Sequence, residues 1–279
     1  MGIVVGIDIG GSTTKIAGFN DGKMLLPVQI EANNAIASLF GAFGKFLYDN
    51  KLELGDIEQV NLTGVGCSSV DQAIYGLPTY KVDEFTANGV GGGYFAGGKK
   101  EFMVVSMGTG TSFVGVKNGV PSHLGGIGIG GGTIIGLSKL ILNTDDIEKI
   151  QELASGGEVG HIDLRVGDIS EKPLPGLNLE ITASNFGKAS SRATCEDKAA
   201  GIVHMVVESI CQTAALIAQG TGIKDFVLIG ALTNFPECAE ICSMIKTMFP
   251  DLHFIVPEAG EYGTAIGTAL AEKSCLKPI

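Results

Sequence analysis

The chain has 279 residues, of which 45% are hydrophobic and 18% charged, a balance typical of a folded globular protein. Its formal net charge of −11 disfavours non-specific binding to nucleic acid, because contact with a phosphate backbone needs a basic face. The first residues enter an apolar strand without a basic leader segment, and the longest weakly polar run, 124–137, is too short to span a bilayer, so we expect a cytoplasmic protein that binds no membrane.

The first predicted elements are three strands and a helix. An apolar strand begins at Ile3, and two further strands lie around 15–19 and 24–30. The pair Asp21-Gly22 between them favours a type I′ hairpin, because glycine tolerates the positive φ of such a turn. Apolar side chains at helical spacing then predict a helix over 35–51.

The next segments lead from the first half of the chain to the second. A short strand is predicted at 60–64, followed by a loop of small residues and a further helix before Pro78. Residues 82–98 join the two halves, and the glycine-laden stretch 89–98 is interpreted as a loose helix that lines a cleft.

The second half repeats the opening pattern. Residues 101–126 again show strand, loop, strand, tight turn and strand, with Asn118-Gly119 at the turn. Thr133 is the predicted cap of a helix over 133–142, and 172–176 is predicted as an irregular loop. The remaining expected elements are a helix at 199–220, a strand at 225–230, a helix at 237–248, a strand at 254–257 and a helix from about 262.

The turn from Asp8 to Lys15 has the composition of a phosphate-binding loop. Its small and hydroxyl-bearing members allow close backbone approach to phosphate and add donors: Gly10, Gly11, Ser12 and Thr13. Lys15 would add a positive charge, unless its strand turns the side chain away. Asp8 is the candidate ligand for Mg²⁺, directly or through water, since Mg²⁺ prefers oxygen ligands. The alternative interpretation is a tight glycine hairpin with a capping aspartate.

A second small-residue loop occupies the equivalent point of the repeat, and a glycine-rich stretch at 125–132 leads into the next helix. We expect the free amides at that helix start to face a ligand. These two segments supply further nucleotide-binding candidates: Gly108, Thr109, Gly110, Gly131, Gly132, Thr133, Ile134 and Ile135. Gly230 and Ala231, just after a buried strand, are the candidates for contact with adenine or ribose.

Together these motifs resemble the superfamily of ATP-binding folds that includes actin, hexokinase and the heat-shock chaperones. The resemblance implies an α/β fold, two-lobed and actin-like (ribonuclease H-like), with a duplicated hairpin-containing mixed sheet. The lobes would be residues 1–87, with the first phosphate loop, and 88–279, with the second phosphate loop and the adenosine strand. Within that superfamily, Gly108-Thr109-Gly110-Thr111-Ser112, the glycines of 125–132 and Ile181-Thr182-Ala183-Ser184-Asn185-Phe186-Gly187 resemble type II, eukaryote-like pantothenate kinases.

The resemblance implies a reaction and a site. Such kinases, typically homodimers, transfer the γ-phosphate of ATP, with Mg²⁺, to the terminal hydroxyl of pantothenate in the first step of coenzyme A synthesis. The family's catalytic carboxylate lies in a Glu-Phe pair that matches Glu84-Phe85. Glu84 would accept or orient the hydroxyl proton, and the neighbouring Asp83 is the alternative.

One residue departs from the family pattern. The family normally has an arginine before the Gly-Gly at 125–126, where it serves the acceptor site, and this chain has His123. Histidine is only partly charged near neutral pH, so activity should fall as pH rises through its titration if it replaces the arginine. Arg165 and Arg192 are the alternative replacement cations.

Two other functions remain open from the sequence. One is a kinase of the same fold for another small hydroxyl acceptor, such as an amino sugar. The other is a non-catalytic nucleotide sensor, or an ATPase that activates a partner enzyme. An activator of radical enzymes would carry cysteines for a bridging iron–sulfur cluster, whereas the six cysteines here are dispersed without a CxxC pair.

Overall fold

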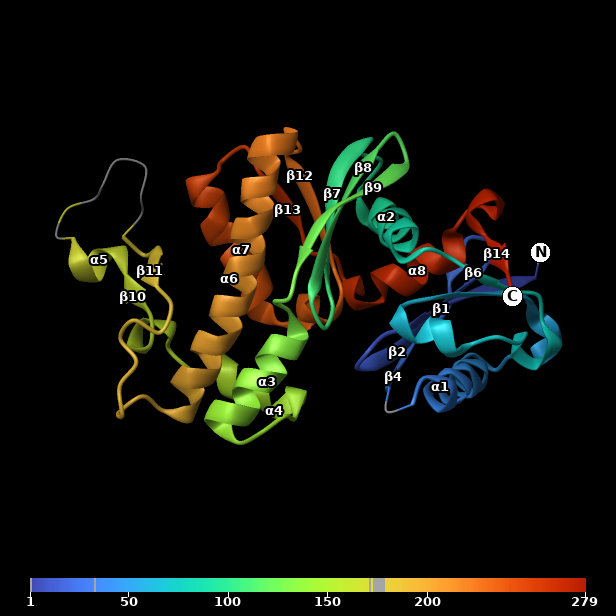
Figure 1. The fold of residues 1–279 in the computed structure, drawn as a ribbon, viewed down its shortest axis with the longest axis horizontal. Coiled ribbons are helices and arrows are strands. Elements are labelled where there is room, and N and C mark those ends of the chain that lie inside the picture. Colours follow the sequence, from blue (N-terminus) through green and yellow to red (C-terminus); the bar gives the residue numbers. More distant parts are fainter. Residues whose placement is uncertain (1, 33, 171, 173–178) are drawn as a thin grey trace.

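The computed structural model describes residues 2–32, 34–170, 172 and 179–279, and it contains two mixed β-sheets flanked by helices (Figure 1). Apart from Lys172, the predicted loop at 172–176 lies outside the described residues. The first sheet has the order β14-β6-β5-β1-β2-β3, and β4 also pairs with β2. Its strands are β1 (Ile3–Ile9), β2 (Thr13–Asn20), β3 (Lys23–Met24), β4 (Val28–Glu31), β5 (Ile57–Thr63), β6 (Thr79–Lys81) and β14 (Lys277–Pro278).

The second sheet repeats the topology of the first. Its order is β13-β12-β7-β8-β9. Its strands are β7 (Glu101–Met107), β8 (Thr111–Lys117), β9 (Val120–Ile127), β12 (Asp225–Ile229) and β13 (His253–Ile255), and a separate pair joins β10 (Leu164–Arg165) to β11 (Thr182–Ser184). In both sheets the leading strand pairs antiparallel with the next strand and parallel with a later one: β1 with β2 and β5, and β7 with β8 and β12. The duplicated mixed sheet is therefore confirmed.

The two predicted hairpin turns have the expected backbone. Asp21 and Gly22 have φ of 47° and 79°, and Asn118 and Gly119 have φ of 51° and 79°. Successive positive φ angles are those of a type I′ turn, which matches the right-handed twist of the flanking strands.

Helices cover the sheets and bury hydrophobic side chains against them. They are α1 (Ala35–Asn50), α2 (Glu84–Phe95), α3 (Gly131–Leu142), α4 (Ile147–Ser155), α5 (Val166–Ile169), α6 (Cys195–Thr221), α7 (Pro236–Met248) and α8 (Gly263–Leu270). Helix α1 buries Leu39, Phe43 and Phe46 against the first sheet. Helix α6 is long and apolar enough to cross a membrane by length and composition alone, but 67% of that apolar window is buried in the molecule, which is the pattern of a core helix.

The predicted helix between the fifth strand and Pro78 is wrong. The structure has two 3-10 turns there, Val65–Ser69 and Ile74–Gly76, and Tyr75 takes a positive φ of 50°. The segment is short and interrupted by glycines, so it cannot present the continuous apolar stripe that would hold a helix against the sheet.

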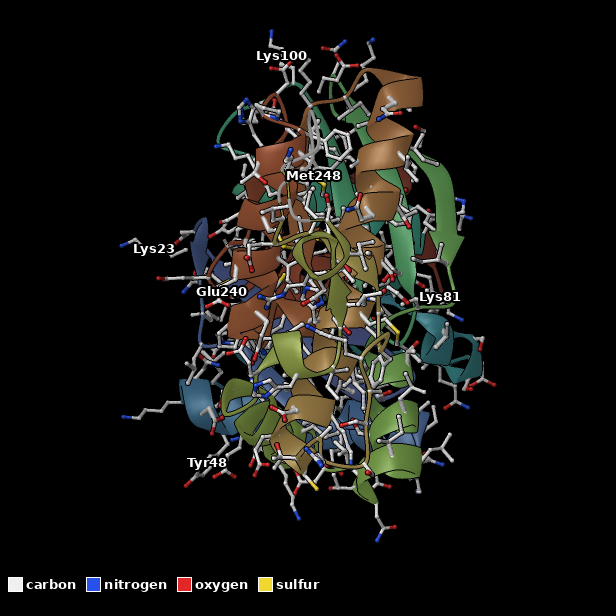
Figure 2. All side chains as sticks on the ribbon, turned by 90° about the vertical axis from the view of Figure 1, so that its left-hand side faces the viewer. Lys23, Tyr48, Lys81, Lys100, Glu240 and Met248 are labelled. Atoms are coloured by element: carbon white, nitrogen blue, oxygen red, sulfur yellow. The ribbon has the colours of Figure 1, made fainter. Side chains whose placement is uncertain are left out.

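Two helices cross between the sheets (Figure 1). The crossing of α2 and α8 is close because glycines stand at the contact: a Cβ on Gly267 would lie 1.8 Å from the carbonyl oxygen of Ala87. Helix α8 also packs on β1, β2 and β5, and β14 pairs antiparallel with β6. The C-terminal segment, placed by sequence in the range 88–279, thus completes the first sheet. Figure 2 shows charged and polar side chains such as Lys23, Lys81 and Lys100 extending outward around this layered body.

Candidate active site

The two glycine-rich loops meet although they lie almost a hundred residues apart in the chain. The Ser12 Oγ and Thr109 Oγ1 atoms are 3.4 Å apart, and an added Cβ on Gly11 would lie 3.5 Å from Thr109 Oγ1. The first loop joins β1 to β2, and the second joins β7 to β8, so each sheet contributes the turn of its leading hairpin. The structure thereby brings together the two predicted phosphate loops.

The loop backbone offers unpaired donors at this meeting point. Gly10 donates its N–H to the Thr13 carbonyl at 3.0 Å, which closes the first turn. Within the described part of the chain, five other loop amides donate no hydrogen bond: those of Gly11, Ser12, Gly108, Thr109 and Gly110. Unpaired N–H groups in neighbouring loops can together form an anion-binding surface suited to phosphate oxygens.

The start of α3 differs from the sequence prediction. The amide of Gly131 donates to the Gly108 carbonyl at 2.8 Å, and that of Gly132 donates to the Thr109 carbonyl at 3.0 Å. Gly130 caps the helix, whereas Thr133 stands at its third position, where its Oγ1 accepts from the Gly130 amide. These amides are therefore not free for a ligand, and they fix the second loop instead.

The two isoleucines of this segment divide between core and surface. Ile134 is fully buried in the core beneath the second sheet, so its side chain faces away from solvent. Ile135 is only partly buried and is the one that can lie against a bound molecule.

A charged pair lies at the base of the first loop. Asp8 and Lys15 are register partners on β1 and β2. Burial raises the pKa of Asp8, and Lys15 opposes that rise; burial lowers the pKa of Lys15, and Asp8 and Glu261 oppose the fall. Lys15 is only 5% exposed, so it has little access to the loop surface.

The surroundings of Asp8 leave room for a hard cation. Gly64, with φ of 87°, follows β5, and a Cβ there would lie 2.6 Å from Asp8 Oδ1. The missing side chain keeps one face of the carboxylate open. A single carboxylate of this kind fits Mg²⁺, which binds through one or two carboxylates together with phosphate oxygens and water. Among the described residues no cluster of three or more His, Cys, Asp or Glu side chains offers a complete metal site.

The two acidic residues at the start of α2 have different surroundings. Asp83 is the N-cap, and its Oδ1 accepts from the Thr86 amide at 3.1 Å. Glu84 begins the helix, and its pKa is raised by desolvation and by the negative charges of Asp8 and Asp83. Asp8 is therefore near enough for its charge to act on Glu84. A raised pKa suits a carboxylate that accepts a proton.

The ring of His123 lies beside this helix start. It stacks on Phe85, with ring centroids 4.0 Å apart and planes at 20°. His123 sits on β9 and Phe85 follows Glu84 on α2, so the stack places His123 beside the residue that neighbours Glu84. Arg165 is engaged elsewhere, because its guanidinium lies 2.6 Å from Glu180 and 3.6 Å from Glu158.

The predicted adenosine strand ends next to the second loop. Gly230 has φ of 99°, and a Cβ there would lie 2.4 Å from the carbonyl oxygen of Met107, the residue before Gly108. The Gly230 amide donates to the Gly260 carbonyl at 2.9 Å, and the partly buried Ala231 opens the next turn. Gly230 and Ala231 therefore lie at the same end of the second sheet as Gly108, Thr109 and Gly110.

Sequence reasoning missed one buried polar bridge. Asn88 is fully buried on α2, accepts from Thr264 Oγ1 of α8 at 2.8 Å and lies 3.5 Å from Ser112 Oγ of β8. It thus links α8 and the second sheet to the helix that carries Glu84. An asparagine four residues after that glutamate, inside a glycine-rich helix, was the only sequence signal.

Relatives of the chain fall in one family. The family model described as Fumble matches residues 92–246. A type II pantothenate kinase of Bacillus cereus is 31% identical over 284 residues, covering 95% of this chain and 97% of the relative. One from Bacillus anthracis is 33% identical over 279 residues, with 95% and 96% covered, and one from Staphylococcus epidermidis is 30% identical over 278 residues, with 94% and 98% covered.

Solved structures share the fold at low sequence identity. The activator of the 2-hydroxyisocaproyl-CoA dehydratase from Clostridium difficile with bound ADPNP has a TM-score of 0.66 and 17% identity, with 96% of this chain and 93% of that chain covered. A ROK family glucokinase from Streptomyces griseus in complex with glucose and AMPPNP has a TM-score of 0.60 and 12% identity, with 98% and 100% covered. The expected α/β fold is therefore confirmed, since it is shared with these two structures.

Proposed function

Because this chain belongs to the type II pantothenate kinase family, we propose that it transfers the γ-phosphoryl group of ATP to the terminal hydroxyl of pantothenate, the first step of coenzyme A synthesis. The observation that carries the proposal is the contact of Ser12 with Thr109 at 3.4 Å. It joins two loops with unpaired amides, and phosphoryl transfer depends above all on positioning and on neutralising charge at the phosphates.

The triphosphate of ATP would lie between these loops. The amides of Gly11, Ser12, Gly108, Thr109 and Gly110 would donate to its oxygens, with help from the Ser12 and Thr13 hydroxyls. The first amides of α3 act indirectly, since they hold the second loop through the carbonyls of Gly108 and Thr109. Gly230, Ala231 and Ile135 would contact the nucleoside.

Asp8 would hold Mg²⁺, with Gly64 leaving the required space and Lys15 moderating the carboxylate charge. The bound ion would supply positive charge at the phosphates. Lys15 itself is too buried to contact a phosphate in this conformation.

Glu84 would orient the acceptor hydroxyl and take its proton as the bond to phosphorus forms. Its raised pKa brings it closer to the basicity that such a transfer needs. His123, held by its stack on Phe85, would donate a hydrogen bond to the acceptor or to the transferring phosphoryl group in place of the family's arginine.

We further propose two lobes with the cleft between them as the binding site, residues 1–87 with the returning segment 263–279 forming one, and 88–262 forming the other. Closure of the lobes would exclude water that could otherwise hydrolyse ATP. We expect a cytoplasmic homodimer that binds neither nucleic acid nor membrane, in keeping with the net charge of −11.

Activity is tested by incubating the protein with Mg-ATP and pantothenate and measuring 4′-phosphopantothenate by mass spectrometry. The decisive pair of variants is Glu84→Gln and Asp83→Asn, which remove the same charge from adjacent residues. Asparagine caps a helix as well as aspartate does, so Asp83→Asn should keep the helix start. Loss of a general base typically costs about 10²–10⁴-fold, and we expect that loss in Glu84→Gln alone.

Product from the wild type that survives in Glu84→Gln would remove Glu84 from the catalytic role. Binding of ATP without any product would exclude pantothenate as the acceptor and direct the search to other hydroxyl compounds.

A further inference from the structure

Helix α2 carries Glu84 as its first residue and packs on the second sheet through glycines. An added Cβ on Gly89 would lie 2.6 Å from the Cβ of Pro121, and one on Gly92 would lie 2.3 Å from Val104 Cγ2. The helix backbone can therefore lie directly on β9 and β7 at these points. A glycine face has no side chain that interlocks with the sheet, so such contacts hold the helix close without fixing its position along the strands.

Asn88 supplies the directional contacts that the glycines lack. Among the described residues of α2 it is the only polar one that is buried. Its Oδ1 accepts from Thr264 Oγ1 of α8 at 2.8 Å, and its Nδ2 donates to Ser112 Oγ of β8 at 3.5 Å. Hydrogen bonds depend on distance and angle, so the amide favours one position of α2 between α8 and β8.

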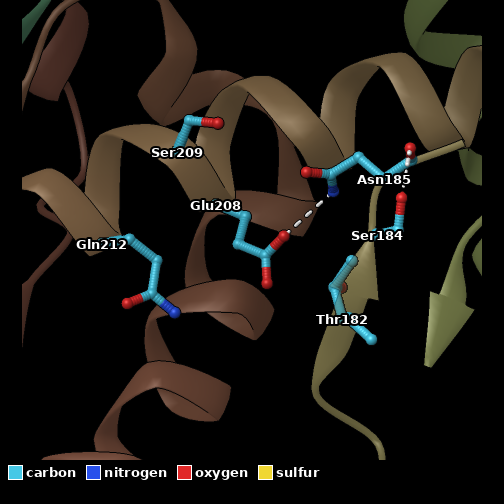
Figure 3. A pocket seen from close by; sticks show the side chains of 7 residues that line it. Thr182, Ser184, Asn185, Glu208, Ser209 and Gln212 are labelled. Atoms are coloured by element: carbon cyan, nitrogen blue, oxygen red, sulfur yellow. Dashed lines mark hydrogen bonds between the residues drawn. The ribbon is translucent and has the colours of Figure 1, made fainter. Parts of the chain in front are cut away.

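A second asparagine shows why the burial of Asn88 matters. Asn185 lines a polar pocket between β11 and α6, where its Nδ2 donates to Glu208 Oε2 at 3.0 Å (Figure 3). Asn185 is partly exposed, so water can reach its amide. Asn88 has no exposed surface, and within the described residues Ser112 Oγ is the only acceptor of its N–H groups. Movement of α2 away from β8 would leave a buried donor unpaired, which is costly.

Ser112 connects Asn88 to the second phosphate loop. It is the second residue of β8, directly after Thr111, whose Oγ1 donates to the Ile129 carbonyl at 2.8 Å. This bond ties the start of β8 to the segment before α3, and the first amides of α3 donate to carbonyls of the same loop. The loop and Ser112 are therefore braced together, and Asn88 links the helix of Glu84 to them.

The distance between Glu84 and the phosphates would depend on this link. Glu84 stands four residues before Asn88, so both side chains project from the same side of α2. Misplacement of a reacting group by about 1 Å can cost about 10²-fold in rate. We propose that Asn88 is a positioning residue for phosphoryl transfer, which acts through Ser112 to set the place of Glu84 relative to the second loop. This inference rests on the proposed kinase function and deepens it.

The test combines Asn88→Leu, Ser112→Ala and the double variant. Leucine keeps a similar shape at position 88 and removes both hydrogen-bonding groups. Thr268→Val is the matched control, because it removes a fully buried hydroxyl of α8 and leaves the contacts of Asn88 in place. Each variant is measured by urea unfolding, by calorimetric titration with a non-hydrolysable ATP analogue, and by the rate of 4′-phosphopantothenate formation per ATP-binding site.

We expect Asn88→Leu to lower kcat per binding site about 10- to 100-fold, with little change in affinity for the ATP analogue. When Ser112→Ala is already present, the same substitution should change kcat by less than about twofold, because the contact is already absent. Thr268→Val should lose stability and keep kcat. A purely structural role of Asn88 would instead give fewer binding sites with an unchanged kcat for each. That result would overturn the proposal, as would independent losses that multiply in the double variant.

Failure of the kinase assignment has a separate signature. A wild type that binds the ATP analogue and forms no 4′-phosphopantothenate contradicts the proposed acceptor. ADP release with water as the acceptor then compares the same variants, and an equal rate in Asn88→Leu and the wild type overturns the role of Asn88. Transfer to neither acceptor overturns both proposals. If Asn88→Leu does not fold, Ser112→Ala decides alone, because an unchanged kcat in that variant contradicts the link.

Discussion

The ring of Phe85 lies parallel to the imidazole of His123, with centroids 4.0 Å apart and planes at 20°. This contact joins the start of α2, where Glu84 stands, to β9 of the second sheet. The resemblance to type II pantothenate kinases implies an arginine at this position, so the stack holds a histidine that departs from the expected pattern. We therefore propose Phe85 as a positioning residue for His123.

Removing the stack should impair turnover while leaving ATP binding intact. Aromatic pairs contribute about 0.5–1.5 kcal/mol, so Phe85→Leu should lower kcat/KM for pantothenate roughly 2- to 13-fold. Phe85→Tyr retains the ring and should retain activity. Steady-state kinetics with each substrate varied in turn would check this, and equal losses in both variants would contradict it.

The pH dependence of the rate should report Glu84. A base acts in its deprotonated form, so kcat/KM should fall as pH is lowered through the pKa of Glu84, which lies above the usual carboxyl range. The negative charge of Asp83 contributes to that rise. Asp83→Asn should therefore move the acidic limb of the pH profile to lower pH. A limb that stays in place in Asp83→Asn would argue against Glu84 as its origin.

The contact between the loops should depend on the Thr109 hydroxyl. Thr109→Val keeps the shape of the side chain and removes the group that lies 3.4 Å from Ser12 Oγ, whereas Thr109→Ser keeps it. A hydrogen bond of this kind contributes roughly 0.5–1.5 kcal/mol, so the KM for ATP should rise about 2- to 13-fold in Thr109→Val and change little in Thr109→Ser. Direct titration with a non-hydrolysable ATP analogue provides the measurement.

The space beside Asp8 should depend on Gly64. A Cβ there would lie 2.6 Å from both Asp8 Oδ1 and the carbonyl oxygen of Ile9, at a φ of 87°. Gly22 has a similar φ of 79° but nothing within 4 Å of an added Cβ, so Gly22→Ala measures backbone strain alone. We expect a loss of about 1–3 kcal/mol of stability from strain in either variant.

Only Gly64→Ala should also weaken Mg-ATP binding, because only there does the new methyl group displace a carboxylate. Urea unfolding and calorimetric titration of the two variants separate the effects. Equal nucleotide affinities would show that Asp8 does not hold the metal ion.

The sequence could determine the duplicated architecture because its signals are local. Asp21-Gly22 and Asn118-Gly119 fix two hairpins by backbone preference alone, and the apolar strands on either side leave few other pairings. The position of Asp8 at the end of β1, and of the loop residues that follow it, can likewise be predicted from the local sequence alone. The family, too, was predicted from ordered motifs, and the relatives confirm it.

Only the tertiary structure decided which groups meet and which donors remain unpaired. The sequence predicts that the amides of Gly131 and Gly132 at the start of α3 are free to bind a ligand. In the structure they donate hydrogen bonds to carbonyls of the second loop, because that loop folds back on the helix start. Strand β14 joins the first sheet, and Asn88 meets Thr264, through contacts between residues distant in the chain. Local preference sets turns and strands, whereas the burial and pairing of each polar atom depend on neighbours that only the folded chain brings together.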